Sequence, residues 1–83
     1  MTTNIEEFNG VRARVRFQPG TEVERQLLAA VRTNRPLDDS QQLTLMDWVE
    51  QALARRGYPE CSVLDFEGVQ NSIDYIFRVE QTL

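Results

Sequence analysis

The sequence has no histidine and no lysine, one cysteine, and no long apolar run. Without histidine, the chain lacks the commonest general base and the commonest metal ligand of enzymes. The single cysteine, Cys61, excludes an internal disulfide and a cysteine-rich metal site. No apolar run approaches the roughly 20 residues that a membrane helix needs. We therefore expect a protein that is not an enzyme, with no cofactor, no bound metal and no membrane span.

The overall composition describes one small domain with an uneven charge. Its 83 residues are 41% hydrophobic, which is enough for a single modest core. Nine arginines oppose thirteen acidic residues, and residues 58–83 alone account for the net charge of −4. Because phosphate contacts supply most non-specific affinity for nucleic acid, an acidic chain is a poor default binder of DNA or RNA. Residues 1–7 lack the basic and apolar parts of a secretory signal, so we expect a cytoplasmic protein.

In one stretch of the chain, apolar residues and arginines alternate strictly. In residues 11–17, Arg12, Arg14 and Arg16 are interleaved with four apolar side chains. We name these three residues the arginine row. A period of two predicts a half-buried β-strand, with the arginine row on its outer face.

Four further segments show ordinary signals of secondary structure. Apolar residues at helical spacing, bounded by capping residues and by proline or glycine, predict helices over 22–33 and 40–56. Apolar–polar alternation predicts strands over 61–67 and 73–81, joined as a β-hairpin by five residues. We expect residues 1–10 to be a short lead-in, either one helical turn or a flexible segment.

These elements predict an α+β fold with the element order β-α-α-β-β. A two-layer domain is the economical arrangement, with a three-stranded, mainly antiparallel sheet covered on one face by a helical hairpin. Residues 11–83 would form it as a single domain. Because two helices return the chain, we expect the second strand to run opposite to the first. We expect the sequential strand order 1-2-3; the alternative order, 1-3-2, would place the first and third strands in parallel.

The arginine row allows three interpretations, of which the first is a solvated face of the sheet. Acidic residues on the two later strands would then pair with the arginines across the sheet. Cross-strand pairs of this kind contribute about 0.2–1 kcal/mol each. The candidate partners are Asp65, Glu67, Asp74 and Glu80.

A second interpretation is DNA binding. The segment from Arg14 to Glu22, continuing into Leu27-Leu28, resembles the strand and first helix of the ribbon-helix-helix repressors. The resemblance covers residues 11–56 and implies a dimer whose paired strands insert the arginine row into the DNA major groove. There, arginine can bond guanine bidentately. The connection between the two predicted helices is longer than the short turn of that family.

The third interpretation, and our principal prediction, is a small module that binds a protein partner through a sheet face or edge. Such a module would act as an adaptor, an inhibitor or an accessory subunit, and a homodimer is one such assembly. Trp48 and Tyr58 join the arginine row as candidate contact residues, because aromatic residues and arginine are enriched at binding hot spots. Trp48 lies beside the apolar stripe of its helix, so a place at the edge of the core competes with this role.

Overall fold

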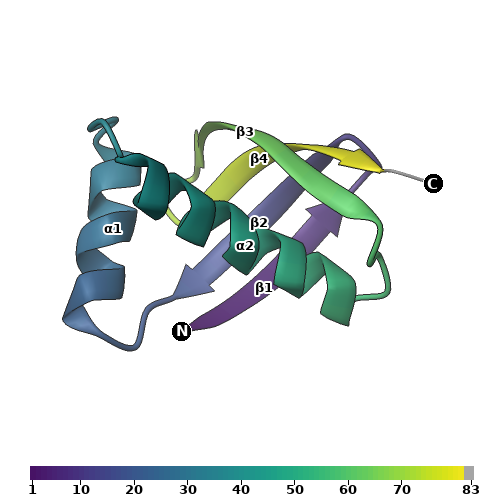
Figure 1. Cartoon of the computed structure of the whole chain (residues 1–83), viewed down its shortest axis with the longest axis horizontal. Coiled ribbons are helices and arrows are strands. Elements are labelled where there is room, and N and C mark those ends of the chain that lie inside the picture. The colour runs from purple at the N-terminus through teal and green to yellow at the C-terminus, as the bar shows by residue number, and fades with distance from the viewer. Residues whose placement is uncertain (82–83) are drawn as a thin grey trace.

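The chain folds as a four-stranded antiparallel sheet with two helices, in the order β-β-α-α-β-β (Figure 1). The structure, a computed structural model, describes residues 1–81. Its elements are β1 (Thr2–Phe8), β2 (Arg12–Gln18), α1 (Glu22–Arg32), α2 (Asp39–Arg55), β3 (Cys61–Gln70) and β4 (Asp74–Gln81). The strands lie in the order β1-β2-β4-β3. The predicted α+β class is confirmed, whereas the predicted number of three strands is wrong.

The additional strand is β1, which occupies most of the expected lead-in over residues 1–10. Asn9 and Gly10 form the turn to β2, and the Asn9 carboxamide oxygen accepts hydrogen bonds from the first two N–H groups after the turn, at 3.1 and 2.8 Å. Gly10 has a φ of 91°, which glycine adopts without steric cost. A bulge between Ile5 and Glu7 interrupts the alternation of β1, so the sequence shows no clear period of two there.

The strand order also differs from the sequential order predicted, because β4 lies between β2 and β3. In Figure 1, α1 lies across one end of the sheet, and α2 alone runs back along it to the opposite end. The strand β3 therefore begins at the same end as β2 and runs in the same direction, not the opposite one as predicted. The strand β4 pairs antiparallel with both of them.

The core lies between the sheet and α2, and α1 closes one end of it (Figure 1). Val49 and Leu53 of α2 are 0% exposed, and Phe77 of β4 is 1% exposed. Full burial of an apolar side chain of this size contributes about 1.5–3 kcal/mol. The sheet contributes alternate residues of its two central strands, as their period of two predicts. The remaining buried apolar residues of these strands are Ala13, Val15, Phe17, Tyr75 and Val79.

Both helices begin with a capping box. The Thr21 hydroxyl accepts a hydrogen bond from the Glu24 N–H at 3.2 Å, and the Glu24 carboxylate accepts one from the Thr21 N–H at 3.1 Å. Asp38 and Gln41 form the same reciprocal pair at the start of α2, at 2.7 and 3.2 Å. A cap of this type contributes about 1 kcal/mol, so local chemistry determines where each helix starts. Neither helix of the described chain is long and apolar enough to cross a membrane.

Candidate functional site

Asp74 is the centre of an ion-pair network on the outer face of the sheet, away from the helices. Its side chain is only 4% exposed. The Nε and Nη2 atoms of Arg16 both lie 3.1 Å from Asp74 Oδ1, and Arg14 Nη1 lies 3.8 Å from Asp74 Oδ2. Arg16 and Asp74 are direct partners on adjacent antiparallel strands, so the strand register itself brings these charges together. A carboxylate buried in this way needs such paired, hydrogen-bonded cations.

Three more carboxylates form ion pairs with arginines of this row. Glu6 and Glu7 of β1 lie 3.4 and 3.5 Å from guanidinium groups of this row, and Glu67 of β3 lies 2.7 Å from another. The sequence predicts Glu67 as one of these partners but not Glu6 or Glu7, because residues 1–10 show no clear strand signal. Each arginine of the row therefore has a carboxylate within 4 Å and would have to exchange it to contact DNA.

The strand that carries the arginine row is an interior strand. It is hydrogen-bonded to β1 on one side and to β4 on the other. The resemblance to the ribbon-helix-helix repressors requires this strand to pair with the same strand of a second chain. Because both edges of β2 are already occupied, it has no free edge for that pairing.

The outer edge of β1 is covered by side chains from the end of α2. Arg55 Nη2 donates a hydrogen bond to the Thr3 carbonyl at 3.2 Å, and Arg56 Nη1 donates one to the Ile5 carbonyl. These arginines also stand at the negative end of the helix dipole, where cations are favourable. Natural sheets use such devices to prevent edge-to-edge association.

The outer edge of β3 is occupied in a similar way. The Val63 N–H donates a hydrogen bond to the Glu50 carboxylate of α2 at 3.2 Å. The Phe66 N–H donates one to the Asp65 carboxylate at 2.9 Å. A partner strand that paired with this part of β3 would have to displace both carboxylates, so strand addition is disfavoured there.

Trp48 and Tyr58, the two aromatic candidates, lie near opposite ends of β1 and do not form a common surface. The Trp48 ring is half-buried, with its centroid 6.2 Å from that of Phe17, at the edge of the core. Tyr58 is 36% exposed and packs edge-to-face against Phe8, with the centroids 4.8 Å apart. The structure therefore does not combine these rings with the arginine row in one site.

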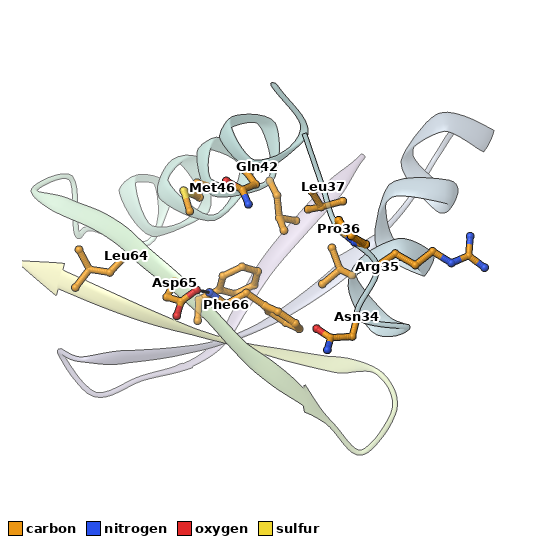
Figure 2. Close-up of a pocket in the computed structure, with 12 residues that line it drawn as sticks. Asn34, Arg35, Pro36, Leu37, Gln42, Met46, Leu64, Asp65 and Phe66 are labelled. Carbon is orange, nitrogen blue, oxygen red and sulfur yellow. Dashed lines mark hydrogen bonds between the residues drawn. The ribbon is translucent and has the colours of Figure 1, made fainter. Parts of the chain in front are cut away.

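A cavity of about 450 Å³ opens between α2, the α1–α2 connection and β3, and we name it the α2–β3 groove (Figure 2). Its lining includes two aromatic side chains, Phe66 and Phe77, which we call its floor. Leu37 and Met46 line the side toward the helices (Figure 2). Leu64 stands at the rim on β3 and is 45% exposed. The groove thus presents apolar side chains to solvent beside a sheet edge, which is typical of a binding surface.

Two bulges in β3 shape this side of the molecule. The pairing with β4 shifts between Val63 and Asp65, and again between Phe66 and Gly68. Simple alternation places Leu64 on the same face as Phe66, opposite Val63. With the extra residue at the first bulge, Val63 is instead 7% exposed, while Leu64 is left at the surface. Gly68 is a local signal for the second bulge. The first bulge, which leaves Leu64 at the surface, has no such signal, which is why the groove could not be predicted.

Cys61 is buried, and burial raises the pKa of its thiol. A protonated, buried thiol is a poor nucleophile. Among residues 1–81, no group of three or more histidine, cysteine, aspartate or glutamate side chains is placed to hold a metal ion. Comparisons of the chain with protein-family models, with curated proteins and with solved structures give no match.

Proposed function

We propose that this protein is a non-catalytic binding module that receives an apolar side chain of a protein partner in the α2–β3 groove. The observation that carries the proposal is an exposed apolar rim, Leu64, above the aromatic floor formed by Phe66 and Phe77. Covering the exposed part of Leu64 would contribute about 1 kcal/mol, since full burial of a leucine contributes about 1.5–3 kcal/mol. Most of the affinity must therefore come from an anchor that fills the floor.

The alternative contact surfaces are already occupied by the protein's own side chains. Carboxylates pair with the arginine row, and side chains satisfy backbone groups on both sheet edges. Within residues 1–81, by contrast, the groove is open. This difference supports the groove as the contact surface rather than the sheet face or a sheet edge.

The charge around the groove indicates the chemistry of the partner segment. Asp65 lines the rim, whereas the Arg35 side chain extends away from the cavity (Figure 2). Residues 58–83, which supply β3, carry the whole net negative charge. We therefore expect a segment with an apolar anchor residue and a basic residue beside it.

Selection from a random peptide display library would test this proposal directly. The purified protein should enrich peptides that carry an apolar anchor flanked by arginine or lysine. Leu64→Glu should weaken the selected peptides at least tenfold, because the charge would be placed at the apolar rim. Leu43→Glu is the matched control, since Leu43 lies on α2, is 68% exposed and does not line the groove.

Backbone NMR shifts in the presence of a selected peptide would locate the contact. Shifts concentrated at Met46, Leu64 and Phe66, with Leu43→Glu binding like the parent protein, would support the proposal. It would be rejected if no peptide is enriched, or if both glutamate variants bind the selected peptides as tightly as the parent does.

A further inference from the structure

A second cavity, of about 440 Å³, lies at the end of the sheet between α1 and the turn that joins β3 to β4. It shares no residue with the α2–β3 groove. Arginines line it from two elements: Arg16 from β2, and Arg25 and Arg32 from α1. Arg25 and Arg32 are seven residues apart, so they lie on the same side of α1, about 10.5 Å apart along its axis. The volume falls within the range of about 300–1,000 Å³ that small-molecule sites occupy.

Two of these three guanidinium groups are open to a ligand. Within residues 1–81, Arg32 forms no ion pair. Arg25 is paired in the described chain only with Glu22, one helical turn earlier, at 3.1 Å, and these side chains are 55% and 69% exposed. Exposed pairs of this kind contribute only about 0.2–0.5 kcal/mol, so Arg25 can exchange Glu22 for an anion. Arg16 is already paired with Asp74 and Glu6, so the positive charge offered to a ligand comes from Arg25 and Arg32.

The opposite side of the cavity is apolar and aromatic. The rings of Phe17 and Tyr75 meet edge-to-face with their centroids 5.1 Å apart, and both line the cavity. Ile73 is 54% exposed at the mouth. Burial raises the pKa of Tyr75, while the positive charge of Arg32 acts in the opposite direction. Arg32 and Tyr75 both line this cavity, so a single ligand in it can contact the guanidinium and the phenol ring.

We propose that this cavity binds a small organic anion, in which a carboxylate or phosphate is attached to a flat apolar ring. The oxyanion would accept charge-assisted hydrogen bonds from Arg32 and Arg25, because guanidinium groups match oxyanions bidentately. The ring would lie against Phe17 and Tyr75, where aromatic contacts favour a flat partner. This site is independent of the proposed protein-binding groove, so each can fail without the other.

Four probes separate the contributions of charge and ring in an NMR titration of the whole protein. They are 2-naphthoate, 2-naphthyl phosphate, the neutral 2-naphthalenemethanol, and inorganic phosphate. We expect one or both naphthyl anions to bind with a dissociation constant of about 1 mM or tighter, which is ordinary for a ligand of this size. The neutral alcohol and inorganic phosphate should each bind at least tenfold more weakly. The tighter of the two naphthyl anions identifies the head group.

Variants assign the binding to the proposed side chains. Arg32→Gln should weaken the naphthyl anions at least tenfold and leave the melting temperature unchanged, because Arg32 is exposed and unpaired within residues 1–81. Arg35→Gln, three residues further on and directed away from the groove in Figure 2, should bind them like the parent. Three results would each overturn the proposal: no binding at about 10 mM, equal binding of the neutral alcohol, or unchanged affinity in Arg32→Gln.

Discussion

The Asp74→Ala substitution would remove the carboxylate that two arginines of the outer sheet face share. Breaking a buried ion pair usually costs about 3–5 kcal/mol, because the remaining charge is left without a partner. Here the side chains of Arg14 and Arg16 are 31% and 39% exposed, and each also has a glutamate of β1 within 4 Å. Both can therefore recover part of the loss from water and from those glutamates. We expect the free energy of unfolding to fall by about 2 kcal/mol.

This loss is large for a domain of 83 residues. At about 0.05–0.15 kcal/mol per residue, the total stability is about 4–12 kcal/mol. The unfolding entropy, at about 2.1 cal/mol/K per residue, amounts to roughly 0.17 kcal/mol/K. A loss of about 2 kcal/mol should thus lower the melting temperature by about 11 °C.

Urea unfolding followed by far-ultraviolet circular dichroism would measure the loss, with melting temperatures as a second readout. Glu80→Gln is the matched control, because Glu80 lies on the same strand, is exposed, and forms no ion pair within residues 1–81. Its effect should stay within about 0.5 kcal/mol. If Asp74→Ala destabilises no more than this control, the carboxylate does not anchor the arginines and the reasoning is refuted.

Two further predictions concern the thiol and the arginine row. Because burial raises the pKa of Cys61 above its ordinary value of 9.0, the unfolded thiol loses its proton at lower pH than the folded one. The contribution of the protonated thiol to stability is complete below pH 9.0 and declines as pH rises above it. Above pH 9.0, the unfolding free energy of the parent should therefore fall more steeply than that of Cys61→Ala. Parallel pH profiles of the two proteins would contradict this. For the arginine row, fluorescence anisotropy with random duplex DNA at about 0.1 M salt should show no binding, because carboxylates already hold these arginines. Binding that salt weakens, and that is lost when Arg12, Arg14 and Arg16 are changed to glutamine, would restore the DNA-binding interpretation.

The sequence was sufficient for elements whose signals are local. The alternation around the arginine row identified a half-buried strand, and the capping residues located both helix starts to within one residue. Thr21 and Asp38 act on N–H groups three residues away, so their chemistry is visible in a short window. The class of fold followed from these elements.

The candidate sites depended on contacts that no short window contains. The exposed rim of the groove exists because the first bulge of β3 leaves Leu64 at the surface. The arginine cavity forms where α1 meets the ends of β2 and β4, so Arg25 and Arg32 acquire their aromatic neighbours only on folding. Neither site has a motif, and the predicted contact residues Trp48 and Tyr58 belong to neither lining.

By itself, the sequence determined the helices, three of the four strands, the outward direction of the arginine row, and the charge available to pair with it. Tertiary structure alone decided the place of β1, the position of β4 between β2 and β3, and which carboxylates the arginines meet. The physical reason is separation along the chain. Helix caps join residues three apart, whereas the hydrogen bond between Arg16 and Asp74 joins residues 58 apart, and only the strand register brings them together.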